Sequence, residues 1–478
     1  MTKGLPCTAR RHAGQLLAWG LLAWLGCAPH SSGLVGLPPA PVMPEDVWRP
    51  RAQAHRRRVI ETLEEGFMPE EPIRRRREQR TSSDGFRKLN PQHAVFNFLH
   101  DYYNIRGAKG TRRLGRWSPG LSRVTLAGAT EDDVASGTLS PVGCELHAGG
   151  LTYDAALHFA SAKPSAATPY LWYYDVLAST AAAEPVLHCY CLHEWAMQYW
   201  PAGSPPPPSR AYQQGTMPLR FVCVCAHFSL SLSLSLSLSL SLTHTHTHTH
   251  VRAHTHTHAP THTHNNNNTT HSVGQEEINR LLEEKGVRCT HVDALRFFAP
   301  AAGPLNRHGG SLERLDQLRL EQPACVHAHM DLLKIALRLT PWVPAEMTAD
   351  ALELALESRK LDVAASPYDA SAFGIQPIKV ETEAGTHSQK VLTIVFRTKC
   401  SWALTSQNLC LGRRLFRERQ LQLMERAQPL RASLMAHYLD FLANAFSQSH
   451  LSQAVATPNA ERFSTAQPGG LPWRLNLI

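Results

Sequence analysis

Three separate segments of the chain each place histidine beside an acidic residue. They are His193-Glu194, His291-x-Asp293 and His327-x-His329-x-Asp331. Imidazole and carboxylate groups bind divalent metal ions and act as general acids and bases. Because charged groups are costly to bury without a partner or a function, the recurrence in three segments favours one shared site. The chain has no Gly-rich phosphate loop, no G-x-S-x-G motif and no paired C-x-x-C motif.

Helical geometry sorts the residues of the third segment. Pro323 suits the first turn of a helix that runs to about Thr340. In such a helix His329 lies on the stripe that faces the core, whereas His327, Asp331 and Lys334 share a polar face. This spacing favours His327 and Asp331 over His329 as site residues.

Each of these residues also has a structural interpretation. Asp293 can cap a helix that begins near Thr290, and His329 can be a hydrogen-bonded core histidine. The polar stripe that ends at Arg338 can be solvated. His193 and Glu194 are adjacent and point about 100° apart on a helix, which weakens a site in which both bind one ion.

The recurring hydrophobic period is helical, which predicts a mainly α protein. The expected domain is a single multi-helix domain with an irregular middle region that contains short strands, as at Val124–Ala127. The predicted helices are Glu45–Glu65, Pro91–Tyr103, Trp172–Thr180, Leu187–Trp200, Glu276–Glu284, Ala349–Ala365 with Thr348 as its N-cap, and Arg417–Phe446.

Low-complexity sequence interrupts this pattern. Ser229–Leu242 alternates Ser and Leu, and the chain then alternates Thr and His from Thr243. Translated dinucleotide repeats give both patterns, and neither offers the varied side chains that a packed core needs. We interpret residues 221–272 as a retained intron outside the folded domain, although its Thr-His tract can bind zinc adventitiously.

Composition sets broad limits. The 478 residues are 43% hydrophobic and carry a net charge of +9, which is enough for a sizeable core and favours anionic partners. Residues 10–28 have the layout of a targeting leader, with two arginines before a short apolar run. Residues 1–42 are therefore either a leader, for an organelle or the secretory pathway, or a mispredicted upstream start. In the second case we expect the cytoplasm or nucleus.

A set of short sequence motifs carries a resemblance to a known family. The motifs are Trp117-Ser-Pro-Gly120, Leu192-His-Glu-Trp-Ala-Met197, Pro218-Leu-Arg220, Arg288-Cys-Thr-His291 with Asp293 and Arg296-Phe-Phe298, Pro304-Leu-Asn306, Leu320-Glu-Gln-Pro323, His327-Ala-His-Met-Asp331 and Ser366-Pro-Tyr-Asp369. Together they resemble a family of bacterial, algal and plant proteins labelled 3-methyladenine DNA glycosylase, over about Met43 to Leu442. The family reads Asn where this chain has His329, which makes that residue a poor candidate for a site.

In that family, the sequence that matches the residues before 221 continues directly into the sequence that matches the residues after 272. The same holds for the residues before 389 and after 416. This places residues 221–272 and 389–416 outside the family pattern as inserts. The expected organisation is therefore an N-terminal part of the helical domain at 43–220, a core part with the polar motifs at 273–388, a C-terminal helix at 417–446 and a tail at 447–478.

The resemblance implies a DNA repair enzyme that flips an alkylated purine out of the duplex and hydrolyses its N-glycosidic bond without a cofactor. Asp331, Glu194 and His327 are the candidate catalytic residues. The candidates for substrate binding are Trp195, Arg288, Arg296, Lys334, Tyr368 and Asp369, with Trp117 as a further stacking residue. The expected partner is alkylated DNA, and we expect no stable membrane partner. The oligomeric state stays open. A helix-hairpin-helix Gly pattern followed by a catalytic Asp is missing from the sequence.

Two alternatives remain from the residues alone. The first is a helical metal-dependent hydrolase of a nucleotide or small phosphorylated molecule, with His291, Asp293, His327 and Asp331 as ligands of a divalent metal. The second is a non-catalytic binding protein.

Overall fold

The computed structural model describes residues 39–69, 85–187, 189–204, 274–381 and 401–456, together with the short pairs 221–222 and 271–272. The first 38 residues, most of the first proposed insert, residues 389–400 of the second and the last 22 residues lie outside the described residues. The expectations about a leader and about the Thr-His tract therefore concern undescribed parts of the chain.

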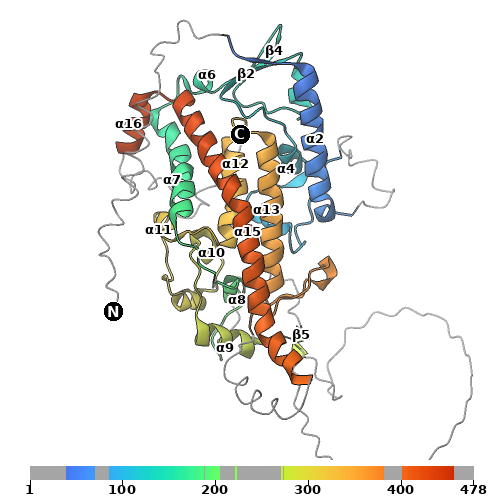
Figure 1. Ribbon diagram of the computed structural model, residues 1–478, viewed down its shortest axis with the longest axis vertical. Helices are drawn as coiled ribbons and strands as arrows, with labels where there is room; N and C mark the ends of the chain where they lie inside the picture. The colour runs from blue at the N-terminus through green and yellow to red at the C-terminus, as the bar shows by residue number, and fades with distance from the viewer. Residues whose placement is uncertain are drawn as a thin grey trace, which may run out of the picture.

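The described core is a bundle of long helices (Figure 1). Its members are α7 (Thr168–Ala182), α12 (Val326–Leu339), α13 (Ala345–Ala365) and α15 (Ser401–Ala445). Helix α12 packs most extensively on α13, and α15 packs on α7, α12 and α13. Helix α2 (Glu45–Leu63) covers the other side of α13 and begins with two acidic residues, which suits the positive end of the helix dipole. The prediction of a mainly α fold is confirmed.

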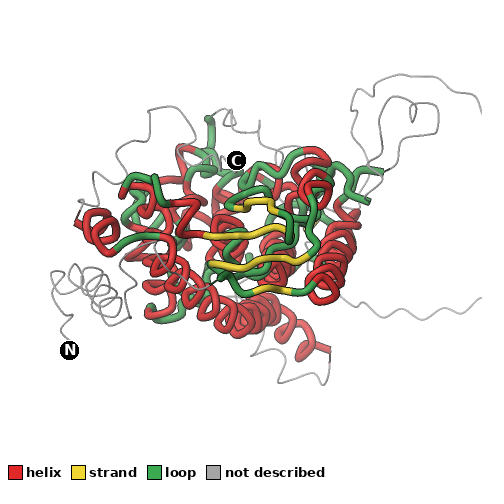
Figure 2. Tube along the Cα trace, turned by 90° about the horizontal axis from the view of Figure 1, so that it is seen from above, coloured by secondary structure: helices red, strands yellow, loops and turns green. Residues whose placement is uncertain are grey.

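A small sheet closes one end of the bundle (Figure 2). The strand order is β1 (Val42–Met43), β2 (Arg123–Ala127), β4 (Gly150–Asp154), β3 (Cys144–His147), with β1 parallel to β2 and the other pairs antiparallel. Residue 150 must be glycine, because its φ is +138° and a Cβ there would meet the Leu126 carbonyl oxygen at 2.0 Å. The strand predicted at 124–127 is confirmed, within a larger sheet than expected.

Shorter helices lie in the segments that connect or follow the long helices and the strands. They are α3 (Asn97–Asp101), α4 (Gly107–Leu114), α5 (Glu131–Ala135), α6 (Ala155–Phe159), α8 (Leu192–Ala196), α9 (Gln275–Lys285), α10 (Val292–Leu295), α11 (Asp316–Leu320) and α16 (Gln448–Ala456). Among the described helices, none combines the length and the apolar composition that crossing a membrane requires.

Two predicted helices are much shorter than expected. The helix predicted at 91–103 is reduced to α3, because the Asn90 side chain accepts the backbone N–H of Gln92 and starts a turn instead. The helix predicted at 187–200 is reduced to α8, because Tyr190 and Cys191 have φ values of 46° and 54° and so break a right-handed helix.

Two helix starts also differ from the prediction. Helix α12 begins at Val326, after Pro323 rather than with it. Helix α13 begins at Ala345 after Pro344, so Thr348 lies inside the helix and does not cap it. The register of the polar residues on each helix is unaffected.

The insert boundaries can be compared with the structure at a few residues. Residues 221–222 pair antiparallel with 271–272, which brings the two ends of the low-complexity segment together. Residues 401–416, assigned above to the second insert, form the first part of α15. Phe416 is fully buried and its ring lies 5.7 Å from that of Tyr190, so the last residues of that assignment pack with the core.

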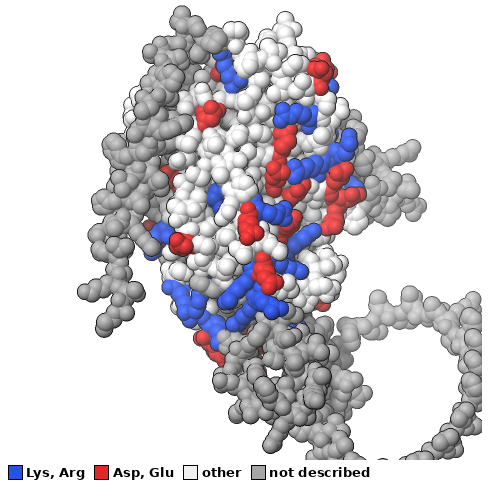
Figure 3. All heavy atoms as spheres, viewed as in Figure 1, with Lys and Arg blue, Asp and Glu red and all other residues white. Residues whose placement is uncertain are grey.

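Charged side chains of both signs are interleaved on the face shown in Figure 3. Arginines of α2 pair with acids of α13, as in Arg58 with Asp350 and Glu353. These exposed pairs contribute little individually to stability. The interleaving of charges also means that a continuous basic surface does not cover the face shown in Figure 3.

Candidate functional site

The three histidine segments meet in the interior of the bundle. The imidazole ring of His327, on α12, lies between the other two rings. Its centroid is 4.3 Å from that of His193 and 5.0 Å from that of His291, and the His291 ring is parallel to it within 4°. All three side chains are buried. The structure therefore brings His193, His291 and His327 into one continuous row.

One end of this row is held by residues of α8 and α13. His193 Nε2 lies 3.0 Å from Asp362 Oδ1 and 3.9 Å from Glu194 Oε1. The guanidinium of Arg359 forms ion pairs with both Glu194 and Asp362. Because Arg359 and Asp362 are three residues apart on α13, they project from the same helix face into this end of the row.

The other end of the row is held by residues of α10, α11 and α12. His291 Nδ1 lies 3.3 Å from Glu321 Oε2, and His291 Nε2 lies 3.8 Å from Asp331 Oδ2. Asp331 also accepts a 2.8 Å hydrogen bond from Lys334 Nζ. Glu321 is held in turn by the amide of Gln317. His291 is thus fixed between two carboxylates.

Asp293 joins this end as the centre of a cationic cluster. It pairs with Arg296 on its own helix, with Arg314 at 3.3 Å and with Lys334 at 3.4 Å. Although burial opposes ionisation, these three cations hold the pKa of Asp293 well below its usual range. Asp293 is therefore a carboxylate whose charge is already balanced.

The histidines differ in their protonation behaviour. Burial opposes a positive charge on His193 and His291, but Asp362 and Asp331 respectively outweigh it, so the pKa of each histidine is raised. Burial, together with the charges of these two neighbours, holds the pKa of His327 well below its ordinary value. The row thus favours a neutral histidine between two that bind protons readily.

A pocket of about 130 Å³ opens beside Asp331 and Asp293. Its charged lining includes Lys334, Arg296, Arg314, Arg338 and Asp101. Its aromatic lining consists of Tyr102, Tyr103, Trp172, Tyr173 and Phe297. Cations beside flat aromatic faces suit an anionic ligand that carries a ring.

Within the described part of the chain, two groups of side chains have the composition of a metal site. The ligand atoms of His291, Asp293 and Asp331 lie within 4.8 Å of one another, and so do those of Cys191, His193 and Asp362. In the first group Glu321 orients His291, as carboxylates do for metal-bound histidines. However, Lys334, Arg296 and Arg314 already neutralise its two aspartates, which lowers its affinity for a cation.

The sequence-predicted residues divide into two sets. Asp331, Lys334 and Arg296 line the pocket, whereas His327 is outside the lining and stacks on His291. Glu194 belongs to the buried ion pair with Arg359 and is only 1% exposed. That position suits a positioning role better than direct attack on a substrate.

The predicted stacking residues lie elsewhere. Trp195 is fully buried and donates to the Ala365 carbonyl at 2.9 Å, and Tyr368 accepts a hydrogen bond from Gln198. Trp117 is buried against Trp48. Because packed core atoms cover these rings, they are not placed to stack on a base.

The remaining candidates, Arg288 and Asp369, also lie outside the pocket lining. Asp369 accepts the backbone N–H of Ser371 and so closes a turn. His329, judged a poor candidate, is fully buried and donates from Nε2 to the Pro323 carbonyl oxygen at 2.8 Å. The core position expected for His329 is confirmed.

Sequence reasoning missed several residues of the site. They are Cys191, Arg314, Glu321, Arg359, Asp362 and the pocket aromatics Tyr102, Trp172 and Phe297. Arg359 and Asp362 gave a usable signal, because a helix that buries most of its length carries these two charges at a spacing of three. The pocket aromatics gave none, since their spacing also fits an ordinary core.

In comparisons with known proteins, no family model matches the chain, and neither a curated protein nor a solved structure is significantly similar to it. Fold and site together define a helical protein whose buried row of histidines and carboxylates ends at a charged, aromatic pocket.

Proposed function

We propose that the protein is a hydrolase whose reaction centre is the pocket at Asp331, and that it cleaves the N-glycosidic bond of an alkylated purine in DNA. The observation that carries the proposal is the position of Asp331. Asp331 lines the pocket; His291, which is outside the lining, lies 3.8 Å from its carboxylate, and Lys334, which is part of the lining, contacts it at 2.8 Å. A fixed carboxylate at the edge of an aromatic pocket is suited to orient an attacking water molecule.

The pocket chemistry supports this choice of substrate. The rings of Tyr102 and Phe297 lie 4.8 Å apart in the lining and offer apolar faces to a flipped base. Arg296, at 40% side-chain exposure, is placed to meet a phosphate.

The proposed reaction needs few catalytic groups from the protein. An alkylated purine such as 3-methyladenine is cationic, so it leaves as a neutral base without a general acid. The negative charge of Asp331 stabilises the positive charge that develops on the sugar. A substrate phosphate competes for Lys334, which weakens the Lys334 to Asp331 pair as the substrate binds.

A second candidate is a metal-dependent hydrolase of a nucleotide or another small phosphorylated molecule. The proximity of His291, Asp293 and Asp331 favours it, as does the orientation of His291 by Glu321. The three cations on Asp293 and Asp331 weigh against it, because a divalent ion there must displace at least Lys334.

One experiment separates the two candidates. The full chain is incubated with methylated duplex DNA in the presence of a chelator, and free purine release is followed by chromatography. Parallel reactions contain purine nucleotides with Mg²⁺ or Mn²⁺. Base release with chelator is the expected result. Nucleotide hydrolysis that needs the metal, without base release, overturns the first candidate in favour of the second, and no reaction in either assay contradicts both.

A further inference from the structure

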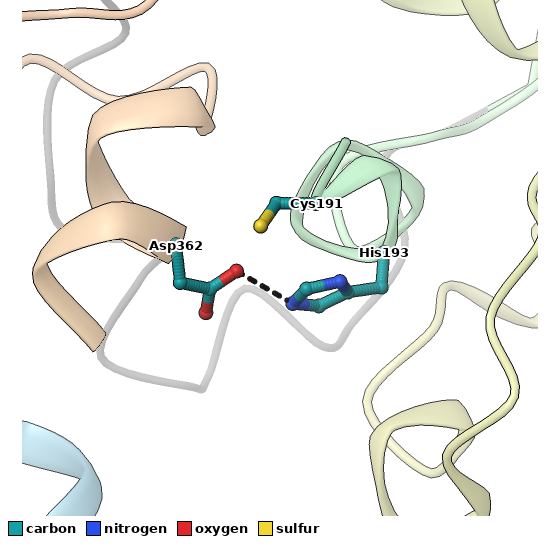
Figure 4. Close-up of side chains that lie close together, drawn as sticks. All are labelled: Cys191, His193 and Asp362. Carbon is teal, nitrogen blue, oxygen red and sulfur yellow. Dashed lines mark ion pairs between the residues drawn. The ribbon is translucent and has the colours of Figure 1, made fainter. Parts of the chain in front are cut away.

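The buried end of the histidine row away from the pocket contains a second donor set. Figure 4 shows Cys191, His193 and Asp362 pointing toward one another from the loop before α8, from α8 and from α13. These side chains are at most 2% exposed, and their ligand atoms lie within 4.8 Å of one another. The three residues do not belong to the pocket lining.

Two of these donor atoms lack a hydrogen-bond partner. His193 Nε2 and Asp362 Oδ1 form an ion pair at 3.0 Å, yet neither atom makes a hydrogen bond within the described part of the chain. Leaving buried polar atoms unsatisfied costs roughly 1–3 kcal/mol each. Metal bonds of about 2.0–2.3 Å place neighbouring donor atoms roughly 3–4 Å apart. A cation between these atoms therefore fits the spacing and satisfies both.

The surrounding residues hold the donors in place. Arg359 binds Asp362 Oδ2 and so leaves Oδ1 directed at His193. This is the kind of outer contact that orients metal-binding carboxylates. Cys191 is presented by two consecutive left-handed residues, Tyr190 and itself. Such a conformation costs of order 1–3 kcal/mol for each residue that is not glycine and concentrates at functional sites.

One thiol, one imidazole and one carboxylate form a set that suits a borderline-soft ion such as zinc and suits magnesium or calcium poorly.

We propose that Cys191, His193 and Asp362 bind one zinc-class divalent cation that ties α8 to α13. Because these donors are enclosed, the site is structural rather than catalytic. It stands apart from the proposed reaction at Asp331 and does not depend on that function.

The test uses cobalt as a spectroscopic probe of the full chain. Purified protein is stripped with a chelator and titrated with Co²⁺, and near-ultraviolet absorption is recorded. Cobalt bound to thiolate gives a sulfur-to-metal charge-transfer band, which histidines of the Thr-His tract cannot produce. We expect the band to saturate at one equivalent and to disappear on addition of Zn²⁺.

Variants locate the site. C191S is expected to abolish the charge-transfer band, and His193→Gln to weaken Co²⁺ binding at least about tenfold. C144S is the matched control, because Cys144 lies on β3 in the sheet, and it should bind cobalt as the wild type does. The titration of the wild type needs no variant, so misfolding of C191S leaves the test intact.

Either of two results overturns the proposal. One is a wild-type protein without a charge-transfer band. The other is a band that survives unchanged in a folded C191S protein.

Discussion

Arg359 and Glu194 are 165 residues apart in the sequence, yet their side chains form an ion pair with exposures of only 4% and 2%. Asp362 shares the same guanidinium. Burial and the neighbouring Asp362 raise the pKa of Glu194, and the two carboxylates outweigh burial to raise that of Arg359. This pair fixes α8 against α13 and so places His193 beside His327.

Breaking that pair should be costly. Arg359→Met leaves two buried carboxylates without their cation, so we expect the free energy of unfolding to fall by about 3–5 kcal/mol in urea denaturation. The double variant E194Q/R359M should lose less than the sum of its single variants. Arg426→Met, which breaks the exposed pair with Glu357, is the control and should cost about 0–1 kcal/mol. Equal losses for Arg359→Met and Arg426→Met would contradict the role given to this pair.

His329 gives a pH-dependent signature. Burial lowers its pKa to about 4, whereas an unfolded chain has a histidine pKa near 6.5. The unfolded state therefore binds the proton first as the pH falls, and about 3 kcal/mol of stability should be lost between about pH 6.5 and pH 4. His329→Gln should show a flatter acid limb in thermal or urea unfolding, while His437→Gln, at a half-buried position on α15, should follow the wild type. Parallel curves for wild type and His329→Gln would show that His329 does not titrate in this way.

Anion binding at the pocket depends on Arg296. Arg296→Gln removes one charged donor, so the dissociation constant for a purine nucleoside monophosphate should rise roughly tenfold, measured by calorimetry. Salt dependence of binding should also weaken. Arg319→Gln is a matched control, since Arg319 pairs with Asp316 at the same i,i+3 spacing on α11. Unchanged affinity in Arg296→Gln would remove Arg296 from the ligand site.

The sequence predicted the helical class because it depends on local periodicity, and the convergence of the histidine segments followed from residue type, since buried His and carboxylate groups need partners. It correctly turned His329 toward the core, since residues on one helix keep their relative directions. The sequence analysis wrongly assigned Trp195 and Tyr368 to ligand binding. An aromatic residue that packs in the core cannot be distinguished by residue type from one that stacks on a ligand. The partner of Glu194 was beyond sequence reasoning, because the contact with Arg359 depends on how α8 docks on α13.

The most direct test of the central claim compares Asp331→Asn with Asp316→Asn in base release from methylated DNA, with thermal midpoints measured beside the rates. Asp331→Asn preserves the shape of the side chain, and Lys334 keeps its contact with Asp293. The free energy of unfolding should therefore fall by only roughly 1–3 kcal/mol, with a correspondingly small drop in the thermal midpoint. We predict that Asp331→Asn lowers the rate by about 10²–10⁴-fold and that Asp316→Asn retains wild-type activity. A folded Asp331→Asn protein that releases base at the wild-type rate would contradict the assignment of Asp331 as the catalytic carboxylate.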